Sequence, residues 1–322
     1  MAFFEEVDSF HGVSSLGKIF LYALLALLGG ALAAPVAWHL IHHLPASLFH
    51  GLIGDVQRMP FHRYLSRSFQ VAAILLLWPL VRVLNIRSME EFGLSRSHRK
   101  GIDFMIGLAA GIPSALLLVG LTIFSGIFEL HSEWSPSTIP KILLSAAVVA
   151  LMEEFLFRGL LLGYLRQTLS NGLAIASASV GFAVLHFLNL PSGAAGEAAP
   201  SWWSGLSAMG ALWSTLPSWP ILGWAFASLF LAGIILGWMT VRTGSLAASI
   251  GLHGSWIFIQ QMFHQVAGFH SVVPDSFLPY IGPPQCHGAV PIGIFPLFSL
   301  IVAGVLAMIF LRNRPEPRRF NR

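Results

Sequence analysis

The chain has 322 residues, of which 55% are hydrophobic and only 10% are charged. Soluble domains carry about a quarter charged residues, so this composition, with a mean hydropathy of +0.73, indicates a polytopic membrane protein. The single cysteine, Cys286, excludes an intramolecular disulfide and a cysteine-based metal site. The net charge of +4 comes from basic residues in loops and a tail, so we expect no nucleic-acid partner.

Apolar runs of about 20 residues predict the membrane spans. Eight such runs occur, and we expect each of them to form a transmembrane helix. They lie near residues 17–41, 68–86, 104–127, 140–164, 172–190, 220–241, 244–264 and 291–312. The predicted fold class is therefore all-α, a polytopic membrane protein of about eight transmembrane helices. We interpret residues 1–322 as a single membrane domain.

Lysine and arginine are unevenly distributed between the segments that join these spans. If both termini are cytoplasmic, thirteen of the 18 basic residues fall on the inner side, and only Arg58, Arg63, Arg67 and Lys141 fall on the outer side. This asymmetry agrees with the positive-inside rule. We therefore expect an integral membrane protein of a bacterial inner membrane with both termini in the cytoplasm.

Two glycine pairs lie four residues apart within predicted spans. Gly107 with Gly111, and Gly233 with Gly237, each place two small residues on one helical face. Small residues at this spacing allow neighbouring helices to approach closely in a membrane. We expect both pairs to be helix-packing positions rather than functional sites.

Three charges interrupt the fourth predicted span, in the stretch "LMEEFLFRGLLLGYL". An ionisable side chain near the bilayer centre costs about 2.5–3.5 kcal/mol, so Glu153, Glu154 and Arg158 are functional candidates. Glu154 and Arg158 are four residues apart in the favourable order, which predicts an ion pair. Glu153 has no partner on its own helix, and an unpaired carboxyl suits proton transfer. The alternative for Glu154 and Arg158 is a purely structural role in holding helices together.

Two histidines also lie within predicted spans, His186 in "GFAVLHFLN" and His253 in "SIGLHGSWIF". With a rise of 1.5 Å per residue, Glu153, His186 and His253 all fall roughly 14–21 Å from the cytoplasmic face. Polar groups from three helices at one depth can converge. The sequence therefore predicts a shared site within the membrane.

The motifs that carry these residues resemble those of a known family. "EEFLFR" fits Glu-Glu-x-x-x-Arg, "FAVLH" fits Phe-x-x-x-His and includes Phe182, and "TGSL" precedes the second histidine. This set is similar to the CPBP family, which comprises type II CAAX prenyl proteases and bacteriocin-processing enzymes and is also called ABI. The motifs lie within residues 140–264, which we interpret as the protease core.

The resemblance implies an intramembrane endopeptidase that hydrolyses a membrane-associated or lipidated protein or peptide. It implies that Glu153 and His186 polarise a water molecule and that His253 stabilises the oxyanion. Glu154 and Arg158 would hold the site in shape. The expected partners are the substrate and the lipid bilayer. No cofactor is certain: Glu153, His186 and His253 could form a zinc site with an open position or a metal-free water site, and the sequence favours the absence of a tightly held zinc.

One position departs from the family pattern. Four residues after the second histidine the family has Asn or another small polar residue, and this chain has Ile257. Loss of an oxyanion donor typically costs about 10²–10³ in rate. Gln260 lies seven residues after His253 on the same helical face and is the nearest substitute, with Asn189 as a second candidate.

Two other classes of function remain open at the level of sequence. A catalytically inactive immunity or scaffolding protein of the same fold is favoured by Ile257 and opposed by the complete Glu-Glu-x-x-x-Arg and Phe-x-x-x-His motifs. A transporter with Glu153 in a proton relay is opposed because the apolar runs show no pair of broken helices.

Overall fold

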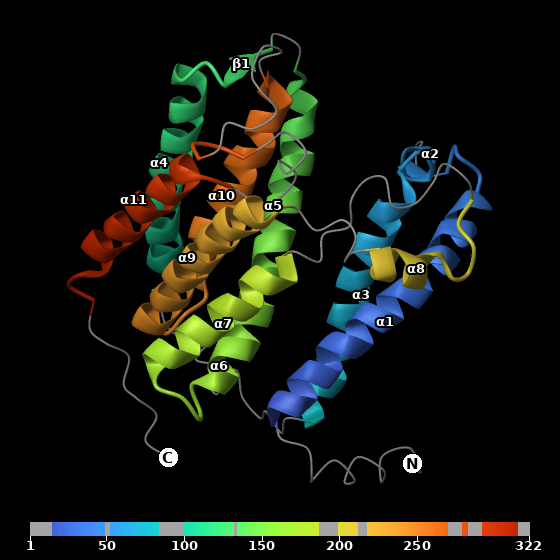
Figure 1. Ribbon diagram of the computed structural model, residues 1–322, viewed down its shortest axis with the longest axis horizontal. Helices are drawn as coiled ribbons and strands as arrows, with labels where there is room; N and C mark the ends of the chain where they lie inside the picture. Colours follow the sequence, from blue (N-terminus) through green and yellow to red (C-terminus); the bar gives the residue numbers. More distant parts are fainter. Residues whose placement is uncertain are drawn as a thin grey trace. The chain divides into compact units, whose positions relative to one another are not determined.

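The computed structural model describes residues 15–48, 52–83, 99–131, 134–186, 199–211, 218–269, 279–282 and 292–314. These residues are mostly helical, with a two-stranded antiparallel sheet. They form two compact units, each of which is described by itself (Figure 1). Unit 1 comprises Met1–Arg87 and Phe187–Leu216, and unit 2 comprises Ser88–His186 and Pro217–Arg322.

Unit 1 is built on a pair of long helices that pack against each other. Its elements are α1 (Ser15–His42), α2 (Leu52–Gln57), α3 (Phe61–Val83) and α8 (Ser204–Ala211). Gly30 of α1 faces Phe69 of α3 so closely that a Cβ at this position would clash. Gly205 of α8 likewise touches the backbone of Ala31. Small residues therefore bring the helices of this unit into direct contact.

Unit 2 contains the remaining elements. They are α4 (Lys100–Phe124), β1 (Phe128–Leu130), η3 (Pro136–Thr138), α5 (Ile139–Glu154), the π-helix η4 (Phe155–Leu161), α6 (Leu162–Leu165), α7 (Asn171–His186), α9 (Trp219–Thr243), α10 (Ala247–Val266), β2 (Ala267–Phe269) and α11 (Ile294–Leu311). Helix α10 packs against α4, α5 and α9 (Figure 1). Strands β1 and β2 pair in antiparallel register, with Glu129 opposite Gly268.

A tight turn positions α10 after α9. Gly244 ends α9 with φ 64°, a left-handed conformation that glycine adopts without steric cost. The hydroxyl of Thr243 accepts a hydrogen bond from the amide of Ser245. The chain therefore reverses within a few residues, and α10 returns alongside α9.

Small residues let α4 and α10 approach closely. A Cβ at Gly107 would clash with the Ala248 carbonyl oxygen, and one at Gly111 would clash with Ser255. On α9, Gly233 faces Ser179 and Gly237 faces Ile175, both on α7. The expectation that both glycine pairs are packing positions is therefore confirmed.

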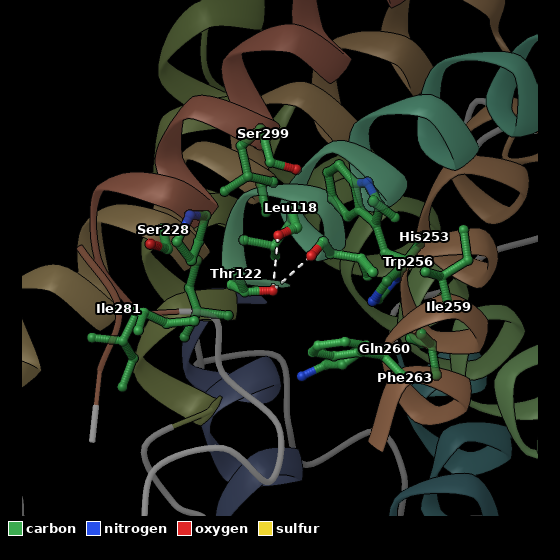
Figure 2. A pocket seen from close by; sticks show the side chains of 18 of the residues that line it. Leu118, Thr122, Ser228, His253, Trp256, Ile259, Gln260, Phe263, Ile281 and Ser299 are labelled. Carbon is green, nitrogen blue, oxygen red and sulfur yellow. Dashed lines mark hydrogen bonds between the residues drawn. The ribbon is translucent and has the colours of Figure 1, made fainter. Parts of the chain in front are cut away.

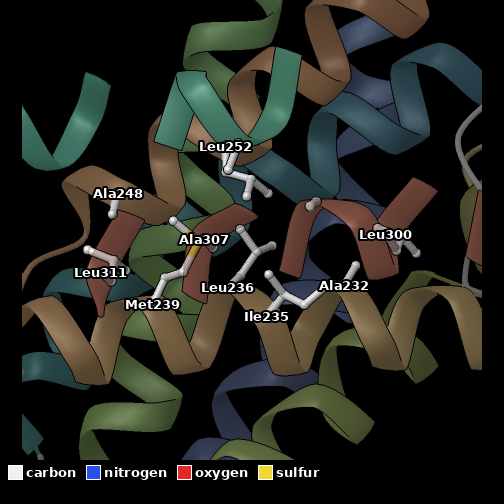
Figure 3. Packing of buried hydrophobic residues seen from close by; sticks show 11 residues of the cluster. Ala232, Ile235, Leu236, Met239, Ala248, Leu252, Leu300, Ala307 and Leu311 are labelled. Carbon is white, nitrogen blue, oxygen red and sulfur yellow. The ribbon is translucent and has the colours of Figure 1, made fainter. Parts of the chain in front are cut away.

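The core of unit 2 lies between α4, α9, α10 and α11. Figure 3 shows Leu236 and Met239 of α9 together with Leu252 of α10 and Leu300 of α11. These four side chains are all nearly inaccessible to solvent. These apolar side chains pack against α10, the helix that carries His253.

Each predicted span coincides with a helix, but the count of eight spans is not confirmed. Five helices in the described part of the chain are long and apolar enough to cross a membrane. They are Phe20–His42, Phe61–Val83, Lys100–Phe124, Trp219–Thr243 and Ile294–Leu311. The predicted fourth span changes into a π-helix directly after Glu154, and α7 has only 16 residues. Helices α5 and α7 have 16 residues each and so fall short by length, and α10, with 20 residues, is not among the five.

The division into units bears on the predicted core, residues 140–264. Its segment Phe187–Leu216 belongs to unit 1, whereas the helices on both sides of that segment belong to unit 2. All the candidate site residues in described helices lie in unit 2. The single membrane domain stays a prediction, since the two units are described separately.

Candidate active site

A buried ion pair anchors the site. Arg158 donates from Nη1 to Oε1 of Glu154 at 2.8 Å, and the two side chains are 3% and 0% exposed. Glu154 is the last residue of α5, and Arg158 lies in the π-helix that follows. The ion pair predicted from the four-residue spacing is thus present. π-Helical segments are rare and are frequently found at functional sites.

His253 joins this pair from α10. Its Nδ1 lies 2.8 Å from Oε1 of Glu154, the oxygen that also accepts from Arg158. Because this carboxylate accepts, His253 donates from Nδ1. Its Nε2 then lies 3.8 Å from Oε2 of Glu153. Glu154 therefore fixes the orientation of the imidazole ring, in the way that carboxylates orient histidines in many active sites.

His186 approaches Glu153 from α7. Its Nδ1 lies 2.8 Å from the carbonyl oxygen of Phe182, and a carbonyl can only accept, so Nδ1 carries the proton. Its Nε2 lies 3.7 Å from Oε2 of Glu153. The two imidazoles therefore present their Nε2 atoms to the same carboxylate oxygen.

The aromatic ring of Phe182 contacts both His186 and Arg158. Its ring centroid is 4.3 Å from that of His186, and the guanidinium carbon of Arg158 lies 4.3 Å from the centroid of the same ring. A cation over an aromatic face is attracted by the ring quadrupole. Phe182 therefore contacts Arg158 and His186 and holds the two motifs together.

Glu153 has a buried oxygen, Oε2, without a hydrogen-bond partner among the described residues. Oε2 of Glu154 and Nη2 of Arg158 are also without such a partner, but these two side chains are joined by the 2.8 Å hydrogen bond between Nη1 and Oε1. The Glu153 side chain as a whole is 19% exposed, as is that of His186. The separations of 3.7 and 3.8 Å from the two histidine Nε2 atoms exceed a direct hydrogen bond, so Oε2 of Glu153 is not occupied by either histidine. The arrangement can hold and polarise a water molecule.

The same donor set bears on the question of a metal. Two imidazole Nε2 atoms and a carboxylate are ligand types that zinc accepts. Among the described residues, no group of three His, Cys, Asp or Glu side chains has the arrangement of a metal site. Zinc ligation by Glu153, His186 and His253 therefore stays a hypothesis that metal analysis can test.

A cavity of about 160 Å³ opens beside the two histidines. His186 and His253 form part of its wall, and most of the remaining lining side chains are apolar. Figure 2 shows His253, Trp256 and Gln260 on one side of the cavity, with Ser228 and Ile281 opposite. An apolar part of a substrate could therefore lie next to the charged cluster.

Ile257, where the family pattern has a polar residue, and Gln260, its nearest substitute as oxyanion donor, also face this cavity. Ile257 and Gln260 both line it, as expected from their helical spacing relative to His253. Asn189, the second candidate, lies outside the described residues. Gln260 is thus the amide side chain available on the wall that carries His253.

Ser249 is a buried residue near the site that we did not predict from the sequence. It lies on α10 one turn before His253, accepts from Oγ1 of Thr240 on α9 at 3.1 Å and donates to the carbonyl oxygen of Leu246 at 3.0 Å. The four-residue spacing from His253 was a usable signal, because it places both residues on one helical face. Serine is common at helix contacts in membranes, so spacing alone did not single it out.

The helices and the buried charged cluster define the class of protein, an all-α polytopic membrane protein with a glutamate–histidine site. Residues 135–259 match the model of a family described as "Type II CAAX prenyl endopeptidase Rce1-like". The matched region includes Glu153, His186 and His253, so the resemblance inferred from the motifs is confirmed for residues 135–259. Searches of curated proteins and of solved structures found no match.

Proposed function

We propose that the protein is an intramembrane endopeptidase that cleaves a membrane-associated or lipidated protein or peptide. The observation that carries this proposal is the geometry at Oε2 of Glu153, which faces the Nε2 atoms of two histidines and has no hydrogen-bond partner among the described residues. The Rce1-like family supports the same reaction class. The apolar cavity beside the histidines supports a substrate with an apolar segment.

In the proposed reaction, Glu153 and His186 hold the attacking water. Nε2 of His186 accepts from the water while Glu153 takes one of its protons as the oxygen attacks the peptide carbonyl carbon. The C–N bond then breaks, and Glu153 returns the proton to the leaving amine. These steps use only the side chains of the chain. A zinc ion at this site would supply Lewis-acid polarisation of the water or carbonyl.

His253 is proposed to stabilise the oxyanion. Because Nδ1 of His253 donates to Glu154, Nε2 can donate only when the ring is an imidazolium. Glu154, itself paired with Arg158, thus supports His253 by holding its Nδ1.

The proposed setting follows from the distribution of basic residues. We place both termini in the cytoplasm and the protein in a bacterial inner membrane, with the lipid bilayer as its surroundings. The substrate would then reach the cluster at membrane depth or just inside the cytoplasmic face.

The second candidate function is a non-catalytic immunity or scaffolding protein. Ile257 favours it, because this apolar side chain lines the cavity where the family pattern places a polar residue. The intact arrangement of Glu153, His186 and His253 favours the protease.

A comparison of membrane proteomes tests the proposal. Cells that produce the native protein and cells that produce Glu153→Ala should differ in at least one membrane protein or peptide, which stays as an unprocessed precursor in the variant. Equal amounts of the two proteins in the membrane are the control. Identical proteomes in conditions where both proteins are abundant would favour the non-catalytic function.

A further inference from the structure

The hydroxyl of Ser228, in the middle of α9, is buried and has no hydrogen-bond partner among the described residues. Hydroxyl side chains inside helices often donate to a backbone carbonyl three or four residues earlier, and Thr122, Ser179 and Ser255 do so. An unpaired buried hydroxyl costs free energy, and such groups are rare in natural proteins. Ser228 therefore offers a donor and an acceptor that the described part of the chain does not use.

Ser228 belongs to the part of α9 that forms the cavity wall. Leu229 and Ala232 line the cavity together with it. Residues four apart share one face of a helix, so Ser228 and Ala232 present the same face of α9 to the cavity. Figure 2 shows Ser228 across the cavity from His253 and Gln260. A substrate segment in the cavity would lie between Ser228 and these side chains of α10.

The other two hydroxyls of the cavity wall are paired. Thr122 donates within α4 to the carbonyl oxygen of Leu118 at 3.1 Å (Figure 2), and Ser299 donates to the carbonyl oxygen of Ser114 at 2.6 Å. No hydrogen bond from a described residue fixes the rotamer of Ser228 in this way. Its hydroxyl can therefore turn toward a group that enters the cavity.

A peptide carbonyl is the group that suits this hydroxyl. Apolar side chains of a peptide match the mostly apolar wall, but the backbone carbonyls between them lose water on entry, which is costly unless a donor replaces it. The cavity volume of about 160 Å³ is well above the roughly 10–15 Å³ that one water molecule needs. The cavity therefore has room for more than a single solvent molecule.

We infer that Ser228 is a specificity-determining residue that donates to a backbone carbonyl of an apolar peptide segment in the cavity. This inference rests on the proposed function, since the segment belongs to the substrate of the peptidase. A hydrocarbon chain in the same place would leave the hydroxyl unpaired. Ser228 thus favours the peptide part of a lipidated substrate over its lipid part at this wall of the cavity.

A kinetic test uses the precursor that accumulates in Glu153→Ala cells as the substrate. Ser228→Ala should raise KM about three- to tenfold and leave kcat unchanged, because it removes a neutral hydrogen bond to the substrate away from the reacting carbonyl. Thr122→Val is the matched control, since it removes a cavity hydroxyl that is already paired within α4 and should leave KM unchanged. An unchanged KM in Ser228→Ala, or an equal rise in both variants, would overturn the inference.

Thermal unfolding separates a binding role from a structural one. Ser228→Ala removes a buried group that is unpaired in the free protein, so the melting temperature should stay the same or rise. A lower melting temperature would show that the hydroxyl stabilises the folded protein and would contradict its role in binding.

A binding test is independent of catalysis. The probes are a farnesylated CAAX peptide, the substrate type that the family description names, and farnesyl-cysteine methyl ester, which lacks the residues after the cysteine. In purified full-length Glu153→Gln protein, the additional change Ser228→Ala should weaken binding of the peptide about three- to tenfold and leave binding of the ester unchanged.

The outcomes of this binding test are distinct. Equal binding of the peptide with and without Ser228→Ala, or no binding of it to either protein, would overturn the inference. An equal loss for both probes would also overturn it, because the ester has no peptide segment. A loss confined to the peptide, in a protein without peptidase activity, would support the role of Ser228 and would contradict only the proposed function.

Discussion

The charged cluster has two sides that contrast in hydrogen bonding. On the paired side, Glu154, Arg158 and His253 are joined by two contacts of 2.8 Å. On the open side, Oε2 of Glu153 lies 3.7 Å from Nε2 of His186 and 3.8 Å from Nε2 of His253, and it has no hydrogen-bond partner in the part of the chain that the structure describes. Both sides start from adjacent residues at the end of one helix.

This contrast separates stability from chemistry. On the paired side, two direct hydrogen bonds occupy Oε1 of Glu154 and tie Arg158 and His253 to it, while Oε2 of Glu154 and Nη2 of Arg158 have no hydrogen-bond partner among the described residues. On the open side, no direct hydrogen bond from a described residue occupies Oε2 of Glu153, so this oxygen can accept a proton. Changes on the open side should therefore affect activity, whereas changes on the paired side should affect the folded state.

The largest effect is expected on the open side. Glu153→Gln should lower kcat by about 10²–10⁴-fold, because it removes the general base and preserves the shape of the side chain. Its melting temperature should stay within about 2 °C of the native value. Kinetics and thermal unfolding of the purified protein measure both quantities, and Glu129→Gln on β1 is the control. Full activity in Glu153→Gln would contradict the assigned role.

On the paired side, Arg158→Ala should destabilise the protein by about 3–5 kcal/mol, since it leaves Glu154 buried without its cation. The expected result is a lower abundance in the membrane and a lower melting temperature. Arg166→Ala, at the end of α6, provides a control with a partly buried arginine that contacts Asn171. Normal abundance and melting of Arg158→Ala would argue against a stabilising pair.

Changes to the proposed oxyanion donor should have an effect of intermediate size on the rate. If Gln260 has this role, Gln260→Ala should lower kcat about 10²-fold. Ile257→Asn alone should raise the rate or leave it unchanged, because the new amide lies on the cavity wall one turn from His253.

The two changes together sharpen this test. With Asn at position 257, Gln260→Ala should cost much less than it does in the native chain, because two groups would serve one oxyanion. A silent Gln260→Ala combined with activity that appears only in Ile257→Asn would favour the non-catalytic function of the natural sequence.

The smallest effect is expected from removal of zinc. We predict that purified protein holds less than one equivalent of zinc and that chelation changes its activity by less than about twofold. Elemental analysis before and after chelation provides the measurement. One equivalent of zinc, lost together with activity in His186→Ala, would assign Glu153, His186 and His253 as its ligands.

Several features of the site could be predicted from local spacing. A helix places residues four apart on one face, so the ion pair of Glu154 with Arg158 and the shared cavity wall of His253 with Ile257 followed from sequence. Depth along each helix also predicted that Glu153 and His186 could meet. These predictions depend only on regular helical geometry within a span.

The number of spans was harder to predict. Residues 155–161 form a π-helix. A hydropathy pattern could not predict this, because it depends only on which residues are present, whereas α- and π-helices differ in which backbone groups are hydrogen-bonded. The pattern also could not show that Phe187–Leu216 belongs to unit 1, since this depends on contacts between distant segments.

The sequence by itself determined the membrane class, the helical fold and the identity of the motif residues, because each depends on composition or on neighbours within a few residues. Only the tertiary structure decided which oxygen meets which donor. His253 donates to Glu154 rather than to Glu153. This contact joins two residues 99 apart in the chain, and it depends on the rotation of each helix about its axis. That rotation is set by glycine contacts and core packing between helices.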